Sequence, residues 1–261
     1  MQHGISVILA PEQIGTLWGI PVTNTLITSW VAIAILIISA IILRSKLSYT
    51  PGRFQALIES LVIYVQDFIH ETLESDKWSR RAFPLLITIF LFIATSNIIE
   101  FTPGIGSLGF FDHAGVFTPL FRSVNTDLNV TLTLAIISVF SIEIMGIIAV
   151  GFWRYAGKFF NFTSPLNFIV GIIEFVSEMS RFVSFSFRLF GNVFAGEVLL
   201  VSMAALVAYV VPIPFLFLEL LVGVVQALIF SILLVVYFTI AASDHDEHES
   251  AHEEKLVEKT A

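Results

Sequence analysis

Long apolar runs separated by short polar segments are the main pattern of this chain. The first run is almost uninterrupted from Ile27 to Leu43 and is followed by Arg44 and Lys46. A helix of about 20 apolar residues crosses the roughly 30 Å hydrocarbon core of a bilayer. The pattern therefore predicts a first membrane-spanning helix over residues 23–44.

The preceding residues, 1–22, do not have the pattern of a signal peptide. They lack a basic n-region, and Pro, Glu and Gly interrupt their short apolar patch. We interpret them as a retained N-terminal arm.

Residues 51–75 have an amphipathic pattern instead of a continuous apolar one. Charged and amide side chains occupy the positions between the apolar ones. This spacing predicts a helix that lies in the membrane interface. The apolar positions at helical spacing are Phe54, Leu57, Ile58, Leu61, Val62, Val65, Phe68 and Ile69.

Two further spans are predicted over residues 82–100 and 129–153. Pro84 is placed in the first turn of the second span, where the missing backbone N–H of proline costs no helical hydrogen bond. Glu143 lies inside the third span, where a carboxylate needs water or a partner.

The last third of the chain holds two longer apolar segments. Residues 162–208 are too long for one helix perpendicular to the membrane, so we predict a bent or steeply tilted helix. Pro212 and Pro214 mark a turn. Residues 212–242 then return antiparallel to it, and an acidic tail follows over residues 243–261.

Composition agrees with this pattern and excludes several classes of protein. The chain is 56% hydrophobic and 13% charged, with a mean hydropathy of +0.90. These values predict an all-α polytopic membrane protein, with residues 1–261 forming one membrane domain. The absence of cysteine excludes disulfides, thiolate metal sites and a cysteine nucleophile. We expect no cofactor.

The net charge of −8 comes largely from the tail, and nucleic acid is therefore not an expected partner. His245, His248 and His252 stand among many carboxylates there, but the composition is that of a solvated segment without a rigid scaffold. We do not predict a metal site in the tail.

Basic residues give a predicted orientation, because cytoplasmic loops of membrane proteins are enriched in Lys and Arg. The loop after the second span has only Arg122, whereas the first and third loops are richer in basic residues. Five crossings then place the N-terminus outside and the tail in the cytoplasm. No internal repeat is evident, which argues against a transporter built from duplicated halves. The basic residues of the first and third loops are Arg44, Lys46, Arg53, Lys77, Arg80, Arg81, Arg154 and Lys158.

The most unusual residue is Arg188, which lies deep inside an apolar run. An unpaired charge in lipid costs at least about 3 kcal/mol on insertion scales, and Arg does not lose its proton at ordinary pH. It therefore needs water, a counter-charge or a charged partner. Arg188 and four other polar side chains lie on one helical stripe, at successive separations of 4, 3, 7 and 4 residues. They are Glu174, Glu178, Arg181, Arg188 and Asn192.

Three more polar residues extend this candidate site. Glu197 lies nine residues after Arg188, on roughly the opposite face of a regular helix. Glu219 and Gln226 share one face of the return helix, and antiparallel pairing would bring Gln226 near Arg188 and Glu219 toward Glu197. Carboxylates that exchange protons, a fixed positive charge and an amide suit an ion path that is broken into two halves.

Other readings of these residues stay open at this point. Arg181 can simply pair with Glu174 or Glu178, and Arg188 can be a structural ion pair. Glu143 can line a path or bond within the bundle. Asn97 and Glu100 can line a channel or mark a membrane boundary. An autonomous ion transporter and a structural membrane scaffold are the competing functional classes.

The sequence resembles subunit a of the F-type ATP synthase membrane sector. The resemblance is carried by Phe187-Arg-Leu-Phe-Gly-Asn-Val-Phe-Ala-Gly-Glu197 and by Gln226-Ala-Leu-Ile-Phe230. It is supported by Asn97-Ile-Ile-Glu100, by Asp127-Leu-Asn129 and by Tyr237. The N-terminal arm and the acidic tail fall outside the resemblance.

This resemblance implies a stator subunit that carries protons to and from a rotating ring of c subunits. It places Arg188 beside the ring, Glu197 and Glu219 in the access channel on the non-cytoplasmic side, and Glu174 at the cytoplasmic exit. Asn192 and Gln226 match the amides that accompany the arginine. One of the two positions held here by Glu197 and Glu219 is often histidine in the family, so their separate roles stay open.

The resemblance also implies partners and a location. The partners are the c-ring, b-type peripheral stalk subunits, membrane lipid and, indirectly, the catalytic F1 head. The location is the bacterial inner membrane. The chain itself would be non-catalytic.

Overall fold

The computed structural model describes residues 11–17, 19–48, 51–102, 108–111, 117–159, 165–206 and 211–243. Among these residues, five helices are long and apolar enough to cross a membrane, namely α1, α3, α4, α6 and α7. The all-α polytopic class is therefore confirmed. The helices are α1 (Asn24–Lys46), α2 (Arg53–Leu73), α3 (Asp76–Glu100), α4 (Leu128–Val150), α5 (Phe152–Phe159), α6 (Pro165–Leu206) and α7 (Pro212–Ser243).

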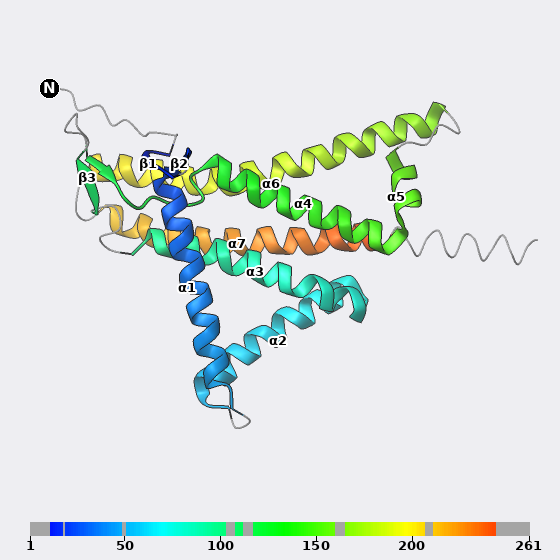
Figure 1. The fold of residues 1–261 in the computed structure, drawn as a ribbon, viewed down its shortest axis with the longest axis horizontal. Helices are drawn as coiled ribbons and strands as arrows, with labels where there is room; N and C mark the ends of the chain where they lie inside the picture. Colours follow the sequence, from blue (N-terminus) through cyan, green and yellow to red (C-terminus); the bar gives the residue numbers. More distant parts are fainter. Residues whose placement is uncertain are drawn as a thin grey trace, which may run out of the picture.

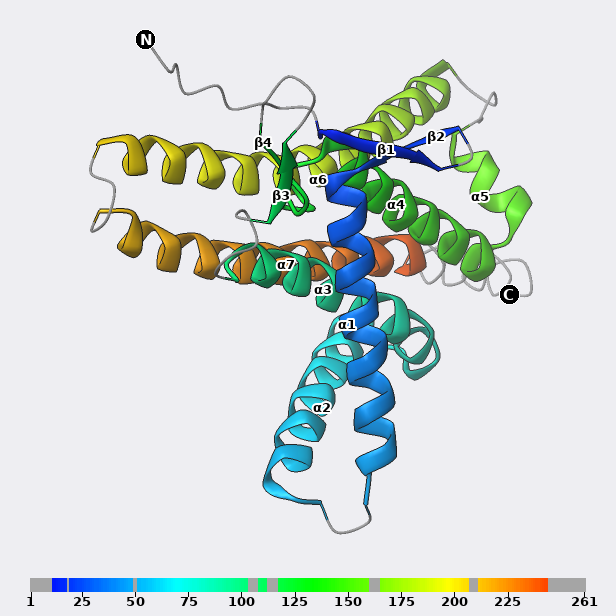
Figure 2. The same cartoon turned by 60° about the vertical axis from the view of Figure 1, so that its left-hand side comes forward.

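Four of the helices, α3, α4, α6 and α7, lie side by side as a bundle (Figures 1 and 2). Helix α7 contacts each of the other three. The core contains Phe185 of α6 against Phe230 of α7, with ring centroids 4.7 Å apart, and Leu86 and Ile142 from α3 and α4. Lipid is as apolar as these side chains, so close packing and polar contacts, not burial from water, hold such helices together.

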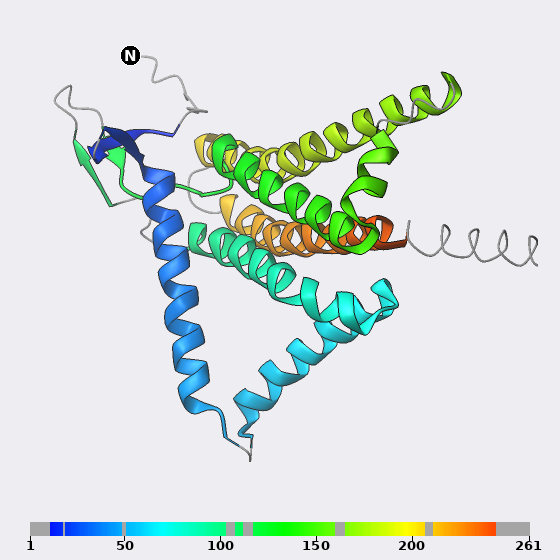
Figure 3. The ribbon, with the colours of Figure 1, turned by 45° about the vertical axis from the view of Figure 1, so that its right-hand side comes forward.

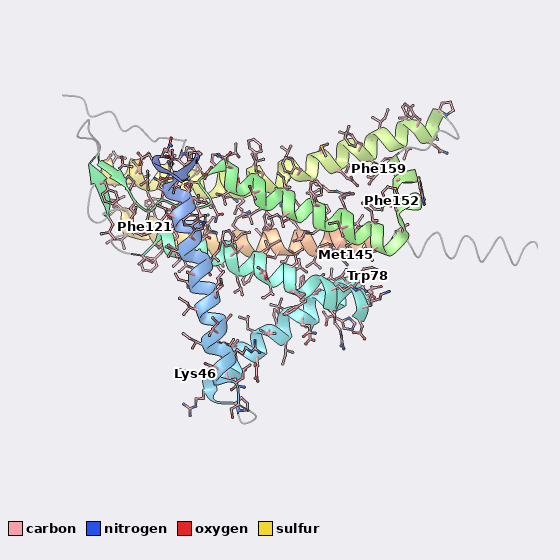
Figure 4. The ribbon with its side chains drawn as sticks, in the orientation of Figure 1. Lys46, Trp78, Phe121, Met145, Phe152 and Phe159 are labelled. Atoms are coloured by element: carbon pink, nitrogen blue, oxygen red, sulfur yellow. The ribbon has the colours of Figure 1, made fainter. Side chains whose placement is uncertain are left out.

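Helices α1 and α2 diverge from this bundle. Together with α3 they enclose a triangular outline in Figure 3, and Lys46 lies near the corner where α1 and α2 approach each other (Figure 4). Helix α2 buries Ile69 and Leu73 near its end, whereas Leu57 and Tyr64 are exposed. The amphipathic pattern therefore packs one end of α2 on the bundle and leaves apolar side chains uncovered by this chain.

Two short β-hairpins lie at the end of the bundle where α1 begins, which we call the hairpin end (Figures 1 and 2). They pair β1 (Gln13–Leu17) with β2 (Ile20–Thr23), and β3 (Gly109–Phe111) with β4 (Phe117–Pro119), both antiparallel. The first hairpin occupies part of the predicted N-terminal arm, for which no strand was expected. Helix α5 marks the opposite end, called the α5 end below.

Two sequence predictions about helix boundaries were wrong. Pro84 does not lie in a first turn, because α3 begins at Asp76 and includes the basic residues before the apolar run. Hydropathy marks the part of a helix that lies in lipid and not its full length. The span predicted to reach residue 153 ends at Val150, because Gly151 has a φ of +93°, and α5 begins directly afterwards. The tail beyond Ser243, with its three histidines, lies outside the described residues.

Candidate ion path

Arg188 lies on α6 at the border between its buried and exposed faces. Phe185 and Leu189 are buried in the bundle, whereas Phe187 is exposed. The guanidinium Nη2 donates a hydrogen bond to Ser184 Oγ at 3.0 Å. No carboxylate of the described residues forms a salt bridge with Arg188. Within this part of the chain the structural ion pair that the sequence left open is therefore not formed.

Three carboxylates gather at the hairpin end, and we call them with Arg122 the carboxylate cluster. Glu100 ends α3, Glu197 lies on α6 and Glu219 lies near the start of α7. Arg122 Nη2 is 3.7 Å from Glu197 Oε2, and Ser123 Oγ donates to Glu100 Oε2 at 2.6 Å. Glu100 interacts electrostatically with Glu197, Glu219 and Arg122.

Glu219 is the least satisfied member of this cluster. Glu219 is only 8% exposed, and neither of its carboxylate oxygens has a hydrogen-bond partner among the described residues. Three neighbouring carboxylates beside one guanidinium cannot all be ionised without leaving uncompensated buried charge. The carboxylate cluster is thus suited to hold a proton and to pass it on.

Glycine at position 196 makes room for Glu219. A Cβ atom at Gly196 would lie 2.7 Å from Glu219 Cδ and would overlap the carboxylate. Helices α6 and α7 therefore approach closely at this point, which brings Glu219 beside the turn of α6 that carries Glu197. The predicted antiparallel pairing of these two helices is seen here.

Amide side chains continue along α7 from the carboxylate cluster toward the level of Arg188. Asn97 Nδ2 donates to the Gly223 carbonyl at 2.8 Å, and Asn125 Nδ2 donates to Asn97 Oδ1 at 2.6 Å. One turn further, Gln226 is 2% exposed, and its Oε1 accepts from Asn192 Nδ2 at 2.5 Å. Residues 219, 223 and 226 share one face of α7, so polar groups from α3, α6 and α7 gather along this face inside the apolar bundle.

A second group of charged side chains lies toward the α5 end, and we call it the ion-pair cluster. Arg181 Nη2 is 3.8 Å from Glu174 Oε1, and its guanidinium carbon lies 4.9 Å from the ring centroid of Tyr237. Glu178 is buried, and its charge and that of Arg181 act on Tyr155. The members are Glu143, Tyr155, Glu174, Glu178 and Arg181.

Glu143 is bonded within this cluster. Tyr155 Oη donates to Glu143 Oε2 at 2.8 Å, and Tyr155 is 5% exposed. Burial, and then the hydrogen bond to Glu143, raise the pKa of the Tyr155 hydroxyl, so the phenol remains the donor. Glu143 is therefore hydrogen-bonded within the chain, and its place in a path stays a prediction.

Arg188 separates the two clusters along α6. It lies ten residues after Glu178 and nine before Glu197, or about 15 and 14 Å at the rise of an α-helix. Figure 4 shows the same separation, with Phe121, next to Arg122 in sequence, at the hairpin end and Met145, Phe152 and Phe159 at the other. The fixed positive charge of Arg188 thus lies between the carboxylate cluster and the ion-pair cluster, which are separated along α6.

Comparison with known proteins gives the family. The sequence model of the ATP synthase A chain family matches residues 26–239. This chain belongs to that family. The matched segment contains both clusters and Arg188.

Curated relatives agree with this assignment of the A chain. ATP synthase subunit a of Campylobacter concisus (strain 13826) is 35% identical over 221 residues, which cover 83% of this chain and 88% of the relative. ATP synthase subunit a, sodium ion specific, of Propionigenium modestum is 32% identical over 231 residues, covering 87% and 77%. The protein of Moorella thermoacetica, ATP synthase subunit a, is 28% identical, covering 87% and 94%.

The sequence alone did not identify every polar residue of this A chain's candidate site. Arg122 was noted only as a loop charge, and Ser123, Asn125 and Tyr155 were not singled out. Arg122 carried a usable signal, because it is the one basic residue between the second and third predicted spans. Tyr155 carried none, since its partner Glu143 is on another helix.

Proposed function

We propose that this A chain is the non-catalytic stator subunit of the ATP synthase membrane sector and carries protons through two offset half-channels. The observation that carries the proposal is the position of Arg188, which has no carboxylate partner in the described chain and lies between two separate polar clusters. A guanidinium cannot become neutral in a membrane, so its counter-charge must come from another molecule. A carboxylate on a rotating ring of c subunits supplies one.

The carboxylate cluster forms the access half-channel in this proposal. Protons enter at the hairpin end, exchange among Glu100, Glu197 and Glu219, and reach the level of Arg188 along the amides of Gln226 and Asn192. The carboxylate of Glu219, which is buried and has no hydrogen-bond partner in the described part of the chain, is the group best placed to receive a proton. The mixture of carboxylates and amides resembles other intramembrane proton relays.

Glu174 and Glu178 of the ion-pair cluster form the exit half-channel. Protons that leave the ring after nearly a full rotation reach Glu174 and Glu178 at the α5 end. Arg188 keeps the two half-channels apart, because a proton that passed directly between them would have to cross a fixed positive charge in a medium of low dielectric constant. Its charge also favours the ionised form of the ring carboxylate that faces it.

Orientation and partners follow from this arrangement. The hairpin end lies outside the cytoplasm and the α5 end lies in it, since the first turns of α3 carry Lys77, Arg80 and Arg81, and Trp78 among them lies toward the α5 end in Figure 4. The N-terminus then lies outside the cytoplasm and the C-terminus lies in it, in a bacterial inner membrane. The c-ring faces Arg188, b-type stalk subunits hold the stator, and ATP chemistry belongs to the F1 head. Each elementary charge that crosses the membrane contributes about 2.3 kcal/mol per 100 mV.

The experiment compares ATP-driven proton uptake by inverted membrane vesicles containing the native chain or Arg188→Ala. We expect the variant to lose uptake because the barrier between the half-channels is gone. Arg44→Ala is the matched control, since Arg44 is exposed at the end of α1. Equal abundance of the assembled complex is checked first. Uptake that persists in Arg188→Ala would overturn the proposal. Repeating the native measurement with and without Na⁺ tests whether the coupling ion is the proton.

A further inference from the structure

The first turns of α1 bury polar side chains, although α1 as a whole is one of the most apolar helices. Asn24, Thr25, Thr28 and Ser29 are buried together with Ala32, and no residue of α1 after Ala32 is buried. Polar side chains buried in a membrane-spanning helix generally bond to neighbouring segments. In the described part of the chain, α1 is thus buried at its hairpin end, mainly through polar side chains.

These side chains hold both ends of the segment from Arg122 to Asp127. Thr28 is 1% exposed, and its Oγ1 donates to the Asn24 carbonyl at 3.0 Å and accepts the Arg122 backbone N–H at 3.2 Å. Thr25 Oγ1 donates to Asp127 Oδ2 at 2.8 Å. Asp127 Oδ1 accepts a hydrogen bond from the backbone N–H of Asn129 at 2.9 Å, and this bond caps the start of α4.

The residue held by Thr28 is the one that brings positive charge to the carboxylate cluster. The Arg122 guanidinium lies 3.7 Å from Glu197 Oε2, already longer than a direct hydrogen bond, and its charge also reaches Glu100. Charge interactions in a low-dielectric site change steeply with distance. A small displacement of the Arg122 backbone would therefore change the electrostatics of Glu197 and Glu100.

We infer that Thr28 is a positioning residue for Arg122, and that the first helix acts on ion entry through this hydrogen bond. Thr25 has the same effect from the other end of the segment. The inference rests on the proposed function, because it assumes that the carboxylate cluster lines the access half-channel. It assigns to α1 a role in the path, although no charged residue of α1 belongs to either cluster.

The test is a double-mutant cycle on ATP-driven proton uptake in inverted vesicles, with the complex complete and its abundance checked. Thr28→Val keeps the shape of the side chain and removes the acceptor, leaving the Arg122 N–H unsatisfied. We expect uptake to fall about threefold to tenfold, and Thr28→Ser, which retains the hydroxyl, to stay close to native. Thr133→Val is the control, because Thr133 is exposed and bonds only to its own helix at the Asn129 carbonyl.

The second arm combines Thr28→Val with Arg122→Gln. If Thr28 acts through Arg122, the double variant transports no less than Arg122→Gln alone, because the charge that Thr28 places is already gone. If the fold losses of uptake in the two single variants multiply in the double variant, Thr28 only stabilises the fold and the inference is overturned. Normal uptake in Arg122→Gln would overturn it as well.

Two further outcomes keep this inference distinct from the proposed function. If Arg188→Ala abolishes uptake while Thr28→Val matches Thr133→Val, the proposed function stands and the inference fails. If Thr28→Val does not assemble, the same cycle is run with Thr25→Val, for which the same coupling to Arg122 is expected. Multiplying losses there would overturn the inference in the same way.

Discussion

The two charged groups of this A chain are built differently. In the ion-pair cluster at the α5 end, Glu143 accepts from Tyr155 and Glu174 lies near Arg181. In the carboxylate cluster at the hairpin end, Arg122 lies near Glu197 and interacts with Glu100, whereas Glu219 has no hydrogen-bond partner among the residues described. Both groups contain three carboxylates and one arginine, and the difference between them is Glu219, a buried carboxylate with neither a hydrogen bond nor a salt bridge among the described residues.

This difference suggests that the two clusters have different roles in the proposed path. Opposite charge and donated hydrogen bonds favour the ionised form of a carboxylate, as an exit requires. Crowded carboxylates without enough partners retain a proton, as an entrance to a ring site requires. The predictions below would each weaken or sharpen this contrast, beginning with the largest effect.

The largest difference is expected between Glu219→Gln and Glu174→Gln. Glutamine is similar in shape but cannot carry a proton. Because Glu219 is buried and accepts no hydrogen bond from any described residue, we expect ATP-driven proton uptake to fall at least about tenfold, a modest effect for a lost proton-transfer group. Glu174 is partly exposed and Glu178 lies one turn away, so Glu174→Gln should cost about threefold or less.

Glu71→Gln is the control for this pair, since Glu71 is exposed on α2. Equal losses in Glu219→Gln and Glu174→Gln would remove the distinction between the clusters. A larger loss in Glu174→Gln would reverse it.

A smaller effect is expected from Gly196→Ala, which adds one methyl group where α6 meets Glu219. The added carbon would lie 2.7 Å from Glu219 Cδ, so the helices or the carboxylate must move. Overpacking of this kind costs about 1–3 kcal/mol. We expect a lower midpoint of thermal unfolding in detergent together with reduced uptake.

Gly157→Ala is the matched variant, because a Cβ there meets nothing within 4 Å. If both alanine variants unfold and transport alike, the close approach of α6 and α7 at Glu219 is not required.

The smallest effect is expected from Tyr155→Phe in the ion-pair cluster. The change removes the donor to Glu143 Oε2 and retains the ring packed on Gly146. We expect a loss of about 1 kcal/mol in the free energy of unfolding, typical of one hydrogen bond, with proton uptake nearly native. Tyr64→Phe is the control, since Tyr64 is largely exposed. A strong loss of uptake would show that Tyr155 belongs to the path itself.

Much of the fold could be predicted because hydropathy reports directly on which segments lie in lipid. The five candidate spans and the amphipathic α2 follow from it. The extra turns of α3 before Pro84, the break at Gly151 and the two hairpins could not, since they depend on helix structure outside the lipid, on one backbone angle and on local strand pairing.

The candidate site shows the same division. The spacing of Arg188, Asn192 and Gln226 along two antiparallel helices predicted that Gln226 faces this stripe of α6, and Asn192 Nδ2 donates to Gln226 Oε1. Arg122 and Tyr155 could not be placed, because each reaches its partner from a loop or a short helix whose course the periodicity does not determine. Contacts within long helices are readable from sequence, whereas contacts from connecting segments require the structure.

The central claim is that the two clusters open to opposite sides of the membrane. The chain has no cysteine, so Ser123→Cys and Glu174→Cys each introduce a single reactive thiol. Passive proton flux through the F1-stripped membrane sector is measured in right-side-out and inverted vesicles after Ag⁺ is added outside, with glutathione trapped inside. The account predicts that Ag⁺ blocks Ser123→Cys only in right-side-out vesicles and Glu174→Cys only in inverted ones. Block of both variants from the same side would contradict it.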